Sequence, residues 1–274
     1  MTSHTPDDIS PEGKPLELLF EDARLPRFDL PAALVQAYGG GFGLARPRVL
    51  ANFVASLDGV VALPGDTESG QIISGKSPAD RFVMGLLRAC ADAVVVGAGT
   101  FRKSAGHLWQ PDRIYPAGAA FFAEARARLG LAPKPRFVVV TAKGDIDTTE
   151  PALKNAFIVT TRAGEASLRA RVDESTTLVV LDADRVHLEG VLDFLRAQGL
   201  PQILTEGGPS LFSELVAARL LDELFVTSSP KLFGRFPNDQ RKSLADGLDL
   251  VGAPLELLSL RRHGSHLFAR YALR

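Results

Sequence analysis

Residues 203–234, ILTEGGPSLFSELVAARLLDELFVTSSPKLFG, contain the feature that most limits the possible folds. The apolar run at 200–204 predicts a buried strand, a pair of glycines at 207–208 ends it, and the apolar positions from Leu211 to Leu221 recur at helical spacing. A strand, a glycine turn and a helix in this order are typical of a sheet that is covered by helices.

The glycine turn of this segment also has the composition of a binding site. Gly207 and Gly208 let the backbone pass close to a ligand, and Pro209 suits a first helical position, where no N–H is needed. Ser210 adds a hydroxyl and an N–H. The free N–H groups and the positive dipole end of the helix favour a phosphate. The alternative is a tight connection between strand and helix that binds nothing.

A second strand that ends in glycines lies upstream. A helix predicted from Ser77 to Arg88 leads into ADAVVVGAGT, residues 91–100, where the continuous β-branched run is typical of a strand covered on both faces. Gly97, Gly99 and Thr100 follow that run. The turn matches only part of the GxGxxG fingerprint and no acidic residue follows about 20 positions later, so an ordinary Rossmann site is not supported. If the two strands are parallel neighbours, two phosphate-sized cradles lie side by side.

A third strand, predicted at 49–56, ends in SLDG, residues 56–59. Ser56 and Asp58 stand at the end of a strand, from which a sheet presents groups to a ligand. The alternative is a turn in which Asp58 bonds its own backbone.

The composition excludes several classes of protein. A chain of 274 residues, 46% of them hydrophobic, with a net charge of −1, fits one ample core or at most two small ones and gives no sign of nucleic-acid binding. No apolar run approaches the ~20 residues of a membrane span, and the polar start carries no secretory signal, so we expect a cytoplasmic protein. The five histidines show no metal-ligand spacing, and Cys90 suits a small core residue better than a nucleophile.

The remaining segments predict an α/β fold. Residues 1–45 are expected to form a partly flexible N-terminal arm with a short helix at 31–38, and GGGFG at 39–43 is expected to be a flexible joint. Residues 46–274 are expected to form one domain, a mixed, mostly parallel sheet with helices on both faces and a C-terminal antiparallel hairpin. Further strands are expected at 136–141, 156–160, 176–181, 223–228, 255–262 and 266–273, and further helices at 119–129 and 188–198.

Three segments taken together carry a resemblance to a known family. NFVASLDG, IISGKSPADRFVMGLLRACADAVVVGAGT and residues 203–234, in this order, resemble the reductase domain of riboflavin biosynthesis, which has a dihydrofolate-reductase-like fold. The resemblance covers about residues 48–273. It implies that NADPH reduces a ribosylaminopyrimidine phosphate to its ribityl form, with the hydride going to the sugar carbon when the ring is open and imine-like. It also implies a homodimer.

The same resemblance assigns roles to individual residues. It implies that the Val54 backbone holds the nicotinamide amide and that residues 208–212 cradle the pyrophosphate. The candidate cofactor-binding residues are Val54, Ser56, Gly97, Gly99, Thr100, Gly207, Gly208, Pro209, Ser210, Leu211 and Phe212. Arg88 and Glu206 match substrate contacts of the family, and Asp58 is the third substrate candidate. From the residues alone, Arg88 and Glu206 also fit partners of helix dipoles. No residue stands out as catalytic, because the cofactor supplies the hydride.

The chain departs from the family after residue 100. An Asp-Asp-Pro, a leucine and a phosphate-binding arginine are usual there, whereas this chain has Ser104 and Ala105 for the aspartates and Pro111 for the arginine. The basic residues weighed as replacements, or as partners of a cofactor 2′-phosphate, are Arg102, Lys103, Arg113 and Lys143, with Thr141 as a hydroxyl partner. Three functions stay open. They are the pyrimidine reductase, a reductase of another heterocycle such as dihydrofolate, and a non-catalytic NADPH-binding protein.

Overall fold

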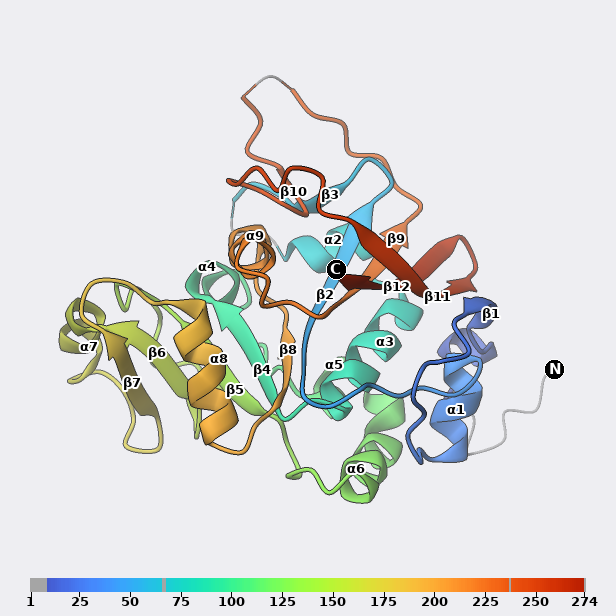
Figure 1. The fold of residues 1–274 in the computed structure, drawn as a ribbon, viewed down its shortest axis with the longest axis horizontal. Helices are drawn as coiled ribbons and strands as arrows, with labels where there is room; N and C mark the ends of the chain where they lie inside the picture. The colour runs from blue at the N-terminus through green and yellow to red at the C-terminus, as the bar shows by residue number, and fades with distance from the viewer. Residues whose placement is uncertain (1–8, 66–67, 237, 274) are drawn as a thin grey trace.

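The computed structural model describes residues 9–65, 68–236 and 238–273. The strands are β1 (Glu17–Glu21), β2 (Arg48–Ser56), β3 (Val60–Ala62), β4 (Ala93–Gly97), β5 (Arg136–Val140), β6 (Phe157–Thr161), β7 (Thr177–Asp182), β8 (Gln202–Thr205), β9 (Glu223–Ser229), β10 (Lys242–Ser243), β11 (Leu255–His263) and β12 (His266–Leu273). Ten of them form one sheet in the order β1-β11-β12-β9-β2-β8-β4-β5-β6-β7, and β3 pairs with β10 beside it (Figure 1).

Helices connect and cover these strands. They are α1 (Ala32–Tyr38), α2 (Ser69–Ser74), α3 (Pro78–Ala89), α4 (Ala98–Arg102), α5 (Pro111–Ile114), α6 (Ala119–Arg128), α7 (Arg162–Leu168), α8 (Leu188–Ala197) and α9 (Pro209–Ala217), with 3-10 turns at Pro11–Gly13, Pro116–Gly118 and Pro151–Leu153. The helix α3 starts after Ser77, whose side chain accepts a hydrogen bond from a backbone N–H of the first turn, and Pro78 takes the first helical position.

The sheet is mixed and mostly parallel, as predicted. Every pairing from β9 through β2, β8, β4, β5 and β6 to β7 is parallel, whereas β9–β12, β12–β11 and β11–β1 are antiparallel. The C-terminal hairpin β11–β12 turns at residues 264–265. The predicted fold class is therefore confirmed.

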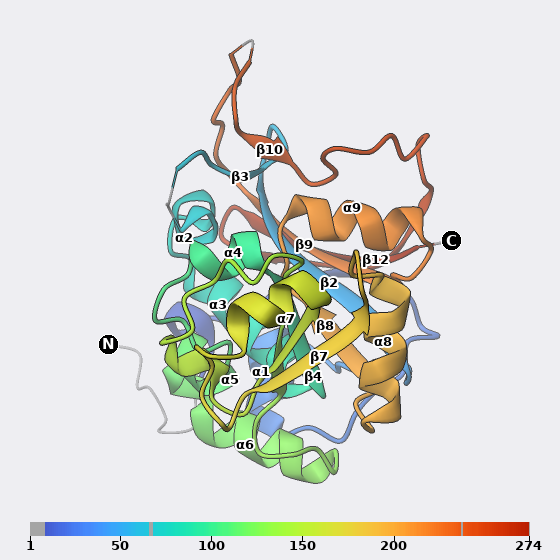
Figure 2. The same cartoon turned by 90° about the vertical axis from the view of Figure 1, so that its left-hand side faces the viewer.

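Alternate residues of the central strands supply two separate cores. Val94 packs in a cluster with side chains of α1, α3 and α6, and its neighbour Val95 packs in a cluster with side chains of α8 and α9. Figure 2 shows α8 and α9 on one side of the sheet and α3 and α6 on the other. Helices on both faces explain why the buried strands read as continuous apolar runs.

The N-terminal segment is more closely packed than predicted. The short helix is confirmed as α1, but β1 pairs with β11 and Leu16 and Phe42 are buried in the main core. Gly39 has a positive φ, and a Cβ there would lie 1.9 Å from the carbonyl oxygen of Leu16. Residues 39–43 are therefore a tightly packed turn and not the flexible joint expected. The division between 1–45 and 46–274 as units that fold separately stays a prediction.

The two strands that end in glycines are direct neighbours. In the parallel pairing of β4 with β8, Val94 lies opposite Leu204 and Val95 opposite Thr205. At the start of these strands, the Asp92 carboxylate accepts hydrogen bonds from the backbone N–H of Gln202 and from Arg46, both at 2.8 Å. The predicted side-by-side arrangement of the two glycine turns is confirmed.

Candidate functional site

A cavity of about 440 Å³ lies at the carboxyl ends of β2, β4 and β8. This volume suits a small-molecule site, and the position is that of ligands in open α/β sheets. The predicted site residues in its wall are Val54, Arg88, Gly97, Gly99, Thr100, Glu206, Gly207, Gly208, Pro209, Ser210 and Leu211. The structure thus brings eleven of the predicted residues together.

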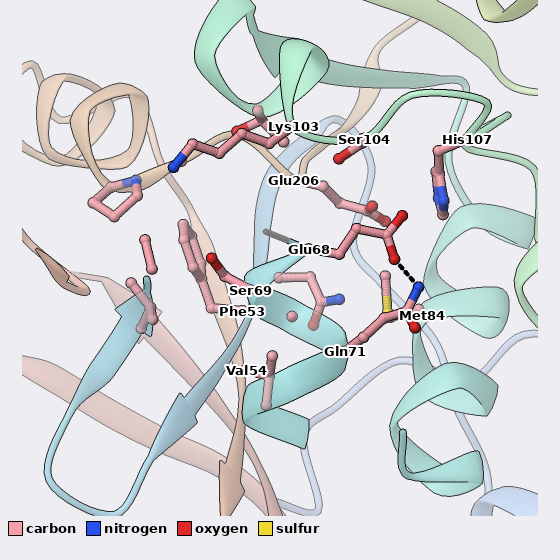
Figure 3. A pocket seen from close by; sticks show the side chains of 18 of the residues that line it. Phe53, Val54, Glu68, Ser69, Gln71, Met84, Lys103, Ser104, His107 and Glu206 are labelled. Atoms are coloured by element: carbon pink, nitrogen blue, oxygen red, sulfur yellow. Dashed lines mark hydrogen bonds between the residues drawn. The ribbon is translucent and has the colours of Figure 1, made fainter. Parts of the chain in front are cut away.

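Figure 3 shows how polar side chains enter this cavity from several elements. Glu206 and His107 lie at one end, and Lys103, from the end of α4, extends away from them. Glu68 precedes α2 and accepts a hydrogen bond from Gln71. The segment at 68–74 therefore contributes a polar part of the wall that the sequence analysis did not identify.

The glycines in the wall leave space for a ligand. A Cβ added at Gly97 or Gly99 would meet nothing within 4 Å. Gly208 has an ordinary φ of −71°, and a Cβ there would come within 4 Å of only the Thr100 hydroxyl, at 3.3 Å. Backbone strain therefore does not require glycine at 208. The N-terminus of the nine-residue helix α9 follows directly and adds free N–H groups. This arrangement fits an extended phosphate-bearing cofactor.

A buried ion pair joins two residues that were predicted to contact substrate separately. The Arg88 Nε donates to Glu206 Oε1 at 2.8 Å and its Nη2 donates to Oε2 at 2.6 Å. The two side chains are 1% and 6% exposed. Arg88 also bonds the Gln110 carbonyl at 3.4 Å. Arg88 is therefore not the free positive group that was expected to meet a phosphate or a carboxylate, because Glu206 already neutralises it.

His107 extends this cluster as a neutral ring. Burial, together with the positive charge of Arg88, lowers the pKa of His107 to about 4, although Glu206 opposes the shift. Its Nε2 lies 3.0 Å from Arg88 Nη2, and since a guanidinium only donates, this nitrogen accepts. The ring proton is then on Nδ1.

Asp80 is a buried acid in the cavity wall that the sequence analysis did not identify. It is 5% exposed and lies in the first turn of α3. Burial raises the pKa of Asp80 to about 6, and the charge of Glu206 adds to this, whereas a hydrogen bond with Thr227 and the charge of Arg81 oppose it. An acid in a first helical turn is ordinary in a sequence, so no local signal marks it.

Three predicted site residues lie outside the cavity wall. The Asp58 carboxylate accepts hydrogen bonds from Ser56 at 2.5 Å and from the backbone N–H of Gly234 at 2.6 Å, so it holds the loop after β9. Ser56 in turn accepts from the N–H of Val60. Phe212 packs in the core beneath α9. The loop contact differs from both earlier readings of Asp58, because its partners belong mainly to another segment.

One of the basic residues weighed as phosphate partners lines the cavity. Lys103 lies in its wall, with Nζ 3.3 Å from the Leu63 carbonyl. Arg102 pairs with Asp145 at 2.7 Å, and Arg113 is largely exposed. Thr141 and Lys143 do not line the cavity.

Two further searches concern only the described part of the chain. No group of three or more His, Cys, Asp or Glu side chains there is placed to hold a metal ion. None of its helices has the length and apolar character needed to cross a membrane.

Comparison with known proteins identifies related sequences. Residues 47–268 match the model of the RibD C-terminal domain. A 2,5-diamino-6-ribosylamino-4(3H)-pyrimidinone 5′-phosphate reductase from Archaeoglobus fulgidus is 28% identical over 192 residues, which cover 69% of this chain and 83% of that protein. The riboflavin biosynthesis protein RibD of Bacillus amyloliquefaciens is 30% identical over 197 residues, 69% of this chain and 47% of that protein. The chain thus spans about half the length of this RibD.

Solved structures share the fold. A pyrimidine reductase-like protein from Corynebacterium diphtheriae superposes with a TM-score of 0.66 at 21% identity, over 90% of this chain and 96% of that chain. A bifunctional deaminase and 5-amino-6-(5-phosphoribosylamino)uracil reductase from Thermotoga maritima gives a TM-score of 0.60 at 23% identity, over 84% of this chain and 57% of that chain.

The raised pKa of Asp80 predicts a pH-dependent gain in stability for Asp80→Asn. A carboxyl whose pKa rises from 3.8 to about 6 on folding stabilises the fold fully below pH 3.8 and loses that contribution as pH rises through 6. The loss amounts to about 3 kcal/mol. We therefore expect the unfolding free energy of Asp80→Asn, relative to the wild type, to increase by up to this amount between pH 4 and pH 7.5 in urea titrations. Asp112→Asn, at the exposed first turn of α5, is the control. A difference that does not change with pH would contradict the account.

Proposed function

Because the chain belongs to the RibD C-terminal domain family, we propose that it is an NADPH-dependent oxidoreductase that reduces the ring-opened ribosylamino group of a substrate such as 5-amino-6-(5-phosphoribosylamino)uracil. The observation that carries this proposal is the cavity where two glycine turns and the N-terminus of α9 meet. When bound, NADPH supplies a hydride. The protein supplies binding, orientation and exclusion of water.

The cofactor half of the proposal uses the residues that line the cavity. The Val54 backbone meets the nicotinamide amide, residues 97–100 meet ribose or phosphate, and residues 207–211 hold the pyrophosphate. Open space above the glycines and the α9 N-terminus support this arrangement. Lys103 meets a phosphate group in the cavity. Ser56 and Phe212 support the wall from behind and make no cofactor contact.

The substrate half of the proposal centres on Glu206. Each of its oxygens accepts one bond from Arg88 and keeps a second acceptor site, which suits the amide or amine groups of a pyrimidine. Arg88 acts as a positioning residue, since its guanidinium fixes the plane of the carboxylate. Asp58 has no part in this site, because it bonds the loop at 233–234.

One observation favours a second candidate, a reductase of another heterocycle such as dihydrofolate. The family's phosphate-binding arginine is replaced by Pro111, and Arg88 is neutralised by Glu206. A substrate without a phosphate needs neither group.

Steady-state oxidation of NADPH with each candidate substrate tests the function. We expect turnover with the pyrimidine substrate and formation of its ribityl product, with NADPH preferred over NADH. Turnover with dihydrofolate instead would favour the second candidate. Saturable NADPH binding with no turnover of either substrate would contradict both and leave a non-catalytic binding protein.

Substitution of Gly208 separates binding from folding. We expect Gly208→Val to raise the Kd for NADPH by about 10-fold or more, the scale of ~1.4 kcal/mol, because the side chain enters the space assigned to the pyrophosphate. The melting temperature should change little, since Gly208 has an ordinary φ. Fluorescence titration and thermal unfolding measure the two effects. Gly190→Val in α8, outside the cavity wall, is the control. A large loss of stability with unchanged affinity would make Gly208 a purely structural residue.

A homodimer in the cytoplasm completes the proposal. The terminal strands were expected to need a cover, and in the structure β12 is paired on both sides and β11 is covered by β1. The sheet edge is thus β1, where Leu18, Leu19 and Phe20 are 43–45% exposed. Apolar edges of this kind favour pairing with another copy. Sedimentation at micromolar concentration should give twice the chain mass of 29.4 kDa, and a monomer would contradict the dimer.

A further inference from the structure

Asp80 is the buried titratable group of the cavity that the proposed function leaves without a task. Its side chain makes no ion pair within the described chain, and its raised pKa keeps it partly protonated near neutral pH. A neutral carboxyl can donate a proton, whereas an ordinary aspartate has already lost it. A buried carboxyl of this kind is costly to the fold, so its presence in a cleft points to a chemical task.

The hydrogen-bond partner of Asp80 places it beside the assigned nicotinamide position. Asp80 bonds Thr227, and in the parallel pairing of β2 with β9 Thr227 lies opposite Val54. Both Val54 and Asp80 line the cavity. The carboxyl therefore enters the part of the cleft where the reacting carbon of a substrate would lie against the cofactor.

The other titratable groups of the cavity are less suited to this task. Both Glu206 oxygens bond Arg88, and His107 is neutral with its Nε2 also bonded to Arg88. Lys242 pairs with Asp246 at 2.9 Å, and an ordinary lysine such as Lys103 binds its proton too strongly for efficient transfer near neutral pH. Glu68 and Arg81 also line the cavity. Glu68 is exposed and bonded by Gln71, and a guanidinium does not release its proton.

We propose that Asp80 is the proton donor of the reduction. As the carbon of the substrate C=N bond receives a hydride from the reduced nicotinamide, the Asp80 O–H bond breaks and the nitrogen gains that proton. The C=N π bond is lost, one C–H and one N–H bond form, and the nicotinamide is oxidised. Solvent then reprotonates the carboxylate. The proposal rests on the proposed function, and it holds for any substrate whose reducible bond is C=N.

Single-turnover kinetics across pH test the proposal. In the wild type, the rate of NADPH oxidation should fall about tenfold per pH unit above the pKa of Asp80. Asp80→Asn keeps the volume and should lower the rate by about 10² to 10⁴-fold and remove this pH dependence. Asp80→Glu should keep part of the rate, and Asp112→Asn is the control. The Kd for NADPH should change less than about twofold in Asp80→Asn, which a merely structural role would not predict.

A second measurement needs no turnover. In protein labelled with ¹³C at aspartate carboxyls, the signal lost in Asp80→Asn should titrate near pH 6 in the wild type. An ordinary carboxyl pKa for that signal would overturn the proposal. Equal rates in the wild type and Asp80→Asn would overturn the proton donor alone. Absence of wild-type turnover with any C=N substrate would overturn the proposed function, and the proton donor with it.

Discussion

The ion pair between Arg88 and Glu206 joins the last turn of α3 to the end of β8, and the arrangement of the cleft depends on it. Each charge is almost completely withdrawn from water, so each needs the other, and removing one partner of such a pair typically costs about 3–5 kcal/mol. The bidentate geometry fixes the direction of the guanidinium as well as its distance. The pair thereby holds α3 against the glycine turn that begins α9, with Asp80 at the other end of the same helix.

Burial gives the charged groups around this pair three different states. Arg88 and Glu206 remain charged because they neutralise each other. His107 stays neutral, because a third charge beside Arg88 would be unfavourable. Asp80 has no ion-pair partner, so burial and the nearby Glu206 raise its pKa. One helix and one strand end thus supply an acceptor for a substrate and an acid for a proton, which are two roles that identical carboxyl groups take only in different surroundings.

Much of the fold was predictable because its signals are local. The runs at 93–96 and 203–204 and the glycines that follow them identify β4, β8 and the turns between strand and helix, and parallel pairing then brings them together. β1 and β3 were not predicted, because short strands at an edge carry little periodicity. The packed turn at Gly39 was predicted to be flexible, since sequence shows the glycines but not the backbone of Leu16 against them. Arg88 and Glu206 were both identified, but 118 positions separate them and nothing in the sequence indicates that they pair. Asp80 was missed for the same reason, because its pKa depends on neighbours from three elements.

A crystal structure of the protein with NADP⁺ and the ribityl product would test the account most directly. We expect the nicotinamide beside the Val54 backbone, the pyrophosphate against residues 207–211 and the product amine within hydrogen-bond distance of Asp80. The Arg88–Glu206 pair should stay intact, with a free Glu206 acceptor site on the pyrimidine. A cofactor bound elsewhere, or an Arg88 that leaves Glu206 to bind the substrate phosphate, would contradict this account of the cleft.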